Sequence, residues 1–238
     1  MNTEHIVKSF DEDLKKLDNT IAEMGGLAEV QLADAVEALI RRDTDLADSV
    51  IASDKKIDAL ETEMDNHATM TLALRQPMAN DLRVTITALR TASLIERIGD
   101  YAKNIAKRSV VLAQSPPLGP TKSIARMASL VQGMIKDVLD AYVARDVDKA
   151  EAVRARDADA DLLHTSLFRE ILTYMMEDPR NITSCTHLLF VAKNLERIGD
   201  HATNIAENVY YLVNGELPTD EREKSDASSF TVVDPDSE

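Results

Sequence analysis

The sequence has no tryptophan, only 4% aromatic residues, and just seven glycines and seven prolines in 238 residues. Sheet proteins usually contain more aromatic side chains and more turns, so this scarcity argues against a β-rich fold. Hydrophobic residues nevertheless make up 44% of the chain. The composition therefore predicts an all-α protein.

Cysteine, long apolar runs and positive charge are also scarce. Cys185 is the only cysteine, so an internal disulfide is impossible and a reducing compartment is compatible with the chain. No stretch approaches the roughly 18 apolar residues of a membrane span, and no signal peptide is recognisable at the N-terminus. The net charge of −15 opposes binding to nucleic acid. We expect a cytoplasmic protein without a membrane span that does not bind nucleic acid directly.

The spacing of apolar residues divides the chain into six long helices. In the first half it predicts helices over about 3–41, 44–75 and 80–113, with a bend at Gly25-Gly26 in the first helix. Three more helices follow, and each half is long enough to bury its own core. We therefore predict two tandem three-helix bundles related by internal duplication. The expected divisions are a first repeat at 1–114, a linker at 115–121, a second repeat at 122–215 and an acidic, disordered tail at 216–238.

One motif occurs twice, 100 residues apart. It reads Glu-Arg-Ile-Gly-Asp at 96–100 and at 196–200, and an asparagine follows four residues later in each copy, at Asn104 and Asn204. Residues four apart share one face of a helix, so the two acids and the asparagine line up. Like charges at this spacing cost roughly 0.2–0.5 kcal/mol per pair. Two such copies predict a compensating cation, for which a multivalent metal ion is the natural candidate.

The second helix of each half carries a matching set of acids. If consecutive helices pack side by side, these acids face the repeated motif and each half presents four carboxylates. Oxygen-rich sites of this kind suit hard ions such as iron, manganese, magnesium or calcium, with zinc also possible. The predicted ligands are Asp54, Asp58, Glu96 and Asp100 in the first half and Asp157, Asp161, Glu196 and Asp200 in the second. Further candidates are Glu61, Asn104, His164, Asn204 and Glu207.

Simpler interpretations of these acids remain open. They can form an ordinary solvated face, and Lys103 and Lys193 lie three residues from a motif acid, where they can neutralise it. The motif acids point about 150° away from the apolar stripe of their helix, so we expect them at the surface. A ferritin-like oxidase needs two Glu-x-x-His motifs, and only Asp161-x-x-His164 comes near. Without a P-loop, a zinc-finger spacing or a nucleophile motif, the sequence does not indicate an enzyme.

The two motifs, together with Arg75-Gln-Pro-Met-Ala-Asn-Asp-Leu-Arg83 and Leu172-Thr-Tyr-Met-Met-Glu-Asp-Pro-Arg180, resemble the PhoU family of phosphate-transport regulators over about residues 3–217. This resemblance implies a cytoplasmic negative regulator of phosphate-starvation genes, without catalysis. It would couple the phosphate ABC transporter to a sensor histidine kinase and carry metal ions on the paired motifs. We also expect a homodimer. The alternatives are a metal-storage or carboxylate-bridged bundle without a signalling role, and a purely structural helical repeat.

The two predicted sites differ at one position. Glu61 in the first half corresponds to His164 in the second, where Glu207 is a possible further carboxylate. Imidazole favours zinc, copper, nickel and iron over magnesium, calcium and manganese, so the second site should prefer the former ions. The alternative is that His164 caps the edge of the bundle and never reaches the ion.

Overall fold

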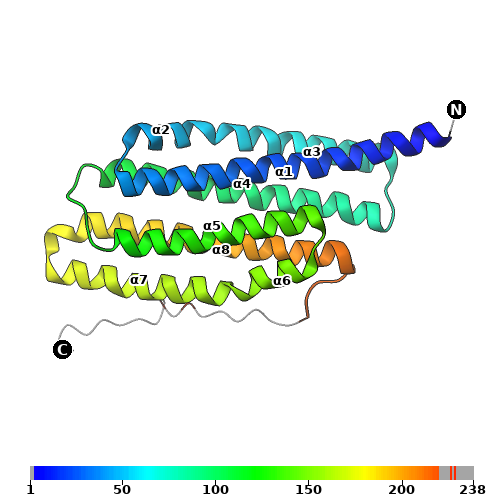
Figure 1. Cartoon of the computed structure of the whole chain (residues 1–238). Coiled ribbons are helices and arrows are strands. Elements are labelled where there is room, and N and C mark those ends of the chain that lie inside the picture. Colours follow the sequence, from blue (N-terminus) through cyan, green and yellow to red (C-terminus); the bar gives the residue numbers. More distant parts are fainter. Residues whose placement is uncertain (1–2, 220–225, 227, 229–238) are drawn as a thin grey trace.

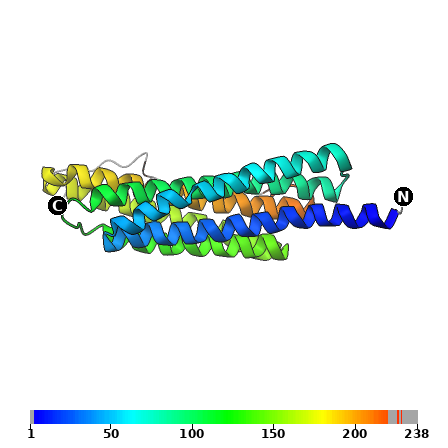
Figure 2. The same cartoon turned by 90° about the horizontal axis from the view of Figure 1, so that it is seen from above.

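The computed structural model describes residues 3–219, 226 and 228, and all regular structure among them is helical. The first half forms α1 (Thr3–Arg41), α2 (Thr44–Ser53), α3 (Lys55–Arg75) and α4 (Asn80–Leu112). The second half forms α5 (Thr121–Ala144), α6 (Val147–Ala155), α7 (Asp157–Glu177), the short 3-10 helix η1 (Pro179–Asn181) and α8 (Ile182–Asn214). In each half the two consecutive helices α2 and α3, or α6 and α7, run on from one another as one interrupted helix (Figure 1). The two resulting three-helix layers lie one above the other (Figure 1) along a common long axis (Figure 2). The predicted tandem three-helix architecture is confirmed.

The turn after the first helix is built identically in the two halves. Arg42 and Arg145 adopt the left-handed conformation, with φ values of 60° and 57°. The next residues, Asp43 and Asp146, cap the following helix by accepting a hydrogen bond from a backbone N–H three residues on. The duplication therefore extends to the capping chemistry.

The second helix of each half is interrupted, whereas the sequence predicted one continuous helix over 44–75. The breaks fall at Asp54, between α2 and α3, and at Arg156, between α6 and α7. Asp54 accepts hydrogen bonds from side chains of α1 and α4, and Arg156 donates to Asp137 of α5 at 2.6 Å. Each break therefore lies where a charged side chain is held by neighbouring helices.

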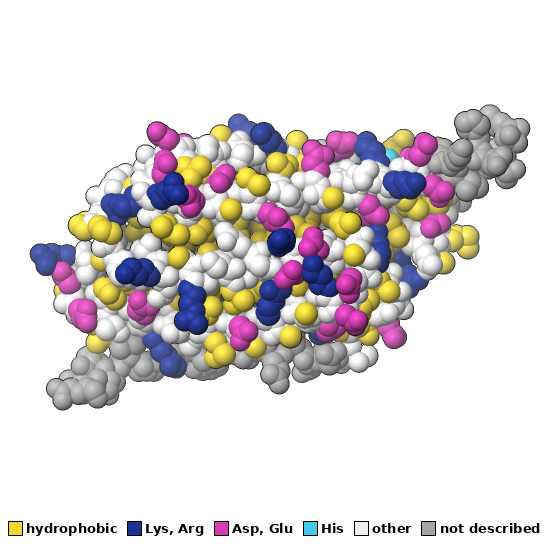
Figure 3. Space-filling view, viewed as in Figure 1, with side chains coloured by type: hydrophobic (Ala, Val, Ile, Leu, Met, Phe, Trp, Pro, Cys, Tyr) yellow, Lys and Arg dark blue, Asp and Glu magenta, His cyan; other side chains and the backbone are white. Residues whose placement is uncertain are grey.

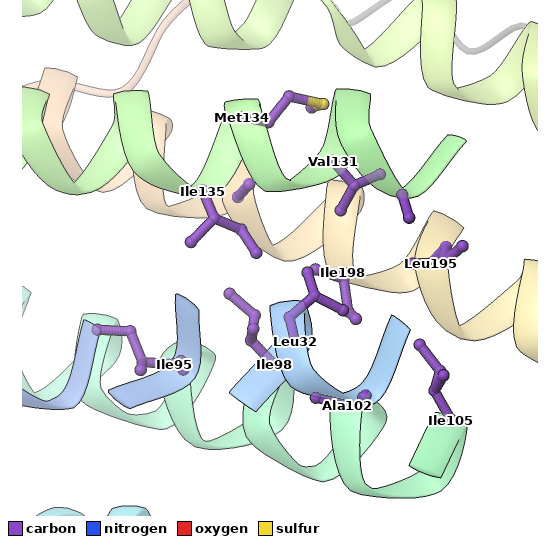
Figure 4. Close-up of a cluster of buried hydrophobic side chains, with 14 of the residues drawn as sticks. Leu32, Ile95, Ile98, Ala102, Ile105, Val131, Met134, Ile135, Leu195 and Ile198 are labelled. Carbon is purple, nitrogen blue, oxygen red and sulfur yellow. The ribbon is translucent and has the colours of Figure 1, made fainter. Parts of the chain in front are cut away.

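The apolar core runs through both halves as one continuous cluster, so the expectation of a separate core in each half is wrong. In Figure 4, Leu32 of α1 and Ile98 of α4 point toward Val131 and Ile135 of α5 and Ile198 of α8. A three-helix layer has an apolar face left over, and stacking the layers buries it. Periodicity shows which face of a helix is apolar but not which helix covers it.

The glycine pair in α1 does not interrupt the helix. A Cβ atom at Gly25 would lie 2.7 Å from Leu139 Cδ2 of α5, whereas one at Gly26 would meet nothing within 4 Å. Gly25 therefore permits α1 and α5 to approach closely. This close approach explains the glycine at position 25 better than the predicted bend in α1 does.

The exposed face formed by α1 and α5 carries basic and acidic side chains interspersed with apolar ones, without a large patch of one sign (Figure 3). No helix within residues 3–219 is long and apolar enough to cross a membrane. Most of the predicted tail at 216–238 lies outside the described residues. Asp226 and Ser228 are described, however, and Asp226 contacts α7 and α8.

Candidate metal and partner sites

The structure confirms that the acids of the second helix face the repeated motif in each half. Lys103 of α4 contacts Asp54, and Thr203 of α8 contacts Asp157. The motif glycines lie at these helix crossings: a Cβ at Gly99 would be 3.0 Å from Ile57 Cδ1, and one at Gly199 would be 3.8 Å from the Cβ of Ala160. A small residue at the crossing therefore brings the two acidic sets together.

We define the first carboxylate face as Asp54, Asp58, Glu61, Glu96 and Asp100. Asp54 is only 2% exposed, and a buried charge is costly unless it is paired. Its two oxygens are held by Lys103 Nζ at 2.5 Å and by Gln31 Nε2 at 3.1 Å. Lys103 also reaches Asp100 at 3.1 Å. The predicted neutralisation by Lys103 is thus present, and it extends across the helices to Asp54.

The rest of this face keeps excess negative charge. Burial raises the pKa of Glu96 to about 7, with further contributions from Asp100, Glu61 and Asp58. Burial and neighbouring carboxylates also raise the pKa values of Glu61 and Asp58. A surface hollow of about 460 Å³ lies here, lined by Glu61, Glu96, Asp100 and Asn104 together with Ser93, Arg97 and Tyr101. The first face is therefore an open, oxygen-lined hollow.

We define the second carboxylate face as Asp157, Asp161, His164, Glu196 and Asp200. All but Asp200 are buried, with exposed fractions of 9% or less. The prediction that the motif acids lie at the surface is therefore wrong for Glu196. Asp157 of this face is held by Thr203 of α8, whose hydroxyl donates to its carboxylate at 3.2 Å.

The second face also has basic partners. Lys193 Nζ lies 2.9 Å from Glu196 Oε1, which confirms the predicted neutralisation by that lysine. Asp226 donates its backbone N–H to Asp161 Oδ2 at 3.1 Å, and its Oδ1 lies 3.4 Å from His164 Nδ1. Nothing in the sequence marked Asp226 as part of this site, because the tail has no periodicity that could position it.

The remaining ligand candidates of the second half, Glu207 and Asn204, lie on α8 outside the second carboxylate face. Glu207 lies beside Arg154 of α6, with Nε and Oε1 3.9 Å apart, and so faces α6. Asn204 is half-buried on α8. Within the described part of the chain, no three His, Cys, Asp or Glu side chains converge as a preformed metal site.

The two motifs meet at the seam between the layers. The rings of Tyr101 and His201, each directly after a motif, stack with centroids 5.6 Å apart. The guanidinium carbon of Arg197 lies 5.7 Å from the centre of the Tyr101 ring. Burial lowers the pKa of His201, and the nearby Arg97 lowers it further. This histidine therefore serves as a packing residue of the seam.

Two stacked three-helix repeats, each with facing acids around an E-R-I-G-D motif, define a class of duplicated helical proteins. The model of the PhoU domain matches residues 21–109 and 124–209, one match in each half. The chain therefore belongs to the PhoU family.

Relatives and solved structures agree with this assignment. The chain is 52% identical over 228 residues to the phosphate-specific transport system accessory protein PhoU homolog of Caulobacter vibrioides, covering 95% of this chain and 99% of the relative. The homolog of Rhizobium meliloti is 51% identical over 230 residues, covering 96% and 97%. The crystal structure of PhoU from Pseudomonas aeruginosa has a TM-score of 0.84 and 40% identity, and covers 87% of this chain and 100% of that one. The phosphate transport system regulatory protein PhoU from Streptococcus pneumoniae has a TM-score of 0.80 and 29% identity, with coverage of 88% and 99%.

Proposed function

We propose that this chain is a cytoplasmic negative regulator of phosphate-starvation signalling, acting as a metal-binding adaptor between a phosphate ABC transporter and its sensor histidine kinase. Relatives that match nearly the whole chain are named as accessory proteins of phosphate transport systems, which supports the link to transport. In this proposal the chain works by contact, without catalysis, and as a homodimer.

The observation that carries the metal-binding part is the charge of the first face. Burial raises the pKa values of Asp58, Glu61 and Glu96, and neighbouring carboxylates raise them further. The carboxylate contribution indicates negative charge that a cation would relieve. Asp58, Glu61, Glu96 and Asp100 would hold the ion. Their all-oxygen set suits iron, manganese or magnesium. A bound cation would neutralise these acids and join α3 to α4.

Asp54 has a different role in the first half. Because Lys103 and Gln31 already occupy its oxygens, Asp54 can join a metal only if that buried arrangement is broken. In the second half Thr203 stands at the position of Lys103, so the ammonium group is missing there. Asp161, His164, Glu196 and Asp200 form a mixed nitrogen and oxygen donor set that suits zinc or iron.

Deleting the gene and analysing the purified protein test this function. Cells lacking the chain should express phosphate-starvation genes at high phosphate, and normal repression there would contradict the regulatory role. The chain should co-purify with transporter or kinase subunits, and elemental analysis should find metal in the same sample. Finding metal but no partner proteins would favour a storage bundle. Finding no metal and no partner proteins would favour a purely structural repeat. A variant carrying Asp58→Asn, Asp100→Asn, Asp161→Asn and Asp200→Asn is the control for metal content.

A further inference from the structure

The contacts of Asp226 are specific on both its backbone and its side chain. Its N–H donates to Asp161 Oδ2 at 3.1 Å. Its carboxylate lies 3.4 Å from His164 Nδ1 and 3.6 Å from Lys193 Nζ, and it accepts from Thr165 Oγ1 at 3.4 Å. The backbone N–H of Ser228 also donates to it at 2.9 Å. One aspartate is thus bound by side chains from both α7 and α8.

The charges explain why an aspartate is accepted beside a carboxylate face. Asp161 receives the backbone donor, while the carboxylate of Asp226 points to the basic side of the site, at His164 and Lys193. The backbone N–H of Asp226 is therefore paired with a carboxylate, and the carboxylate of Asp226 is paired with basic side chains. This arrangement resembles how proteins recognise a peptide, with the main chain providing affinity and one side chain providing specificity.

The first face cannot bind an aspartate in this way. Glu61 occupies the position of His164, and Ser93 occupies that of Lys193, so neither basic group that faces Asp226 has a counterpart in the first face. Asp58 is exposed, whereas its counterpart Asp161 is only 6% exposed. Charge complementarity therefore selects the second face.

We propose that the second carboxylate face is a binding site for a peptide segment presenting an aspartate, and that its occupant is the chain's own C-terminal segment at Asp226. Asp161 Oδ2 and His164 Nδ1 are engaged by this segment. A metal ion at the second face would need the same atoms. The segment and the ion therefore exclude one another, a consequence that rests on the proposed function.

The test uses the full-length chain without metal, in the presence of a chelator. Asp226→Lys places a cation against His164 and Lys193 and should release the segment, while Asp236→Lys makes the same charge change elsewhere in the tail. A fluorescent synthetic peptide with the sequence of residues 222–232 is then titrated by anisotropy. It should bind the Asp226→Lys protein at least about tenfold more tightly than the wild type or the control, because the cis segment no longer competes.

Two further measurements make the outcome decisive. The same peptide with Asp226→Ala should lose binding, and Lys193→Gln in the Asp226→Lys protein should weaken binding, whereas Lys136→Gln on α5 should not. Equal binding to all proteins, or none to the Asp226→Lys protein with its helical circular dichroism intact, overturns the proposal. Zinc titration of the same proteins separates the peptide site from the proposed metal-binding function. Peptide binding without zinc binding contradicts only the metal-dependent function. Zinc affinity unchanged by Asp226→Lys contradicts the mutual exclusion of segment and ion.

Discussion

The two carboxylate faces come from one duplicated motif, yet they balance their negative charge differently. In the first half a lysine within the helix pair neutralises the buried Asp54 and leaves an open acidic hollow beside it. In the second half a threonine replaces that lysine, and the compensating groups His164 and Lys193 lie at the other end of the face, where they hold Asp226. The two halves share their backbone and their acids, but the basic groups that face those acids lie at different positions.

The largest expected effect comes from removing the internal cation of the first face. Lys103→Met leaves Asp54 buried without its ammonium partner, so the free energy of unfolding should fall by about 3 kcal/mol, as when one partner of a buried ion pair is lost. Denaturant unfolding measures the change. Lys107→Met, an exposed lysine on the same helix, is the control. Adding Asp54→Asn to Lys103→Met should recover part of the lost unfolding free energy. If Lys103→Met lowers the unfolding free energy no more than Lys107→Met does, the Lys103–Asp54 pair does not stabilise the fold.

The motif glycines provide the next comparison. A methyl group at Gly99 would lie 3.0 Å from Ile57 Cδ1 and 3.1 Å from Gln31 Oε1, while one at Gly199 makes only ordinary contacts at 3.8 Å or more. Alanine in place of a helical glycine gains about 1 kcal/mol, and overpacking a tight site costs about 1–3 kcal/mol. Gly199→Ala should therefore stabilise the protein and Gly99→Ala should not. Equal midpoints in urea unfolding would contradict the difference in helix approach.

The smallest effect concerns pH. In the folded protein the pKa of Glu96 is raised from 4.5 to about 7, so the folded state binds this proton more tightly than the unfolded state does. Its contribution to stability is therefore present below pH 4.5 and is lost as pH rises toward 7. In metal-free protein, Glu96→Gln should remove this decline in denaturant unfolding curves taken between pH 4.5 and 7.

Glu63 on α3 is the control of opposite sign. A hydrogen bond and the charge of Lys16 lower its pKa, so its contribution is present above the unfolded pKa and is lost as pH falls below about 4.5. Glu63→Gln should flatten the curve on the acid side only. A similar change of slope in both variants would remove Glu96 as the cause.

Local signals made most of the fold predictable. Pro77 and Pro179 end helices where expected, and the period of the apolar residues indicated each helix and its buried face. The facing of Asp54 on Glu96 and Asp100 followed from antiparallel packing. The inward turn of Asp54 was not predictable, because it depends on Gln31 and Lys103 from two other helices.

Contacts without a local pattern were missed entirely. The stacking of the two layers into one core depends on how the surfaces of α1, α4, α5 and α8 fit together. The spacing of apolar residues in the sequence gives no information about this fit. Asp226 lies 65 residues from Asp161 along the chain and belongs to a segment without helical spacing. The replacement of Lys103 by Thr203 could have been found by aligning the two motifs, and it indicates the difference between the faces most directly.

The claim that the two faces are not equivalent is tested most directly by titrating zinc and manganese into full-length proteins that each keep one face. Asp58→Asn/Asp100→Asn keeps the second face, and Asp161→Asn/Asp200→Asn keeps the first. Because only the second face has an imidazole, its preference for zinc over manganese should exceed that of the first face by about tenfold, and His164→Ala should abolish the excess. The same zinc preference in both proteins, or no change on losing His164, would contradict the account.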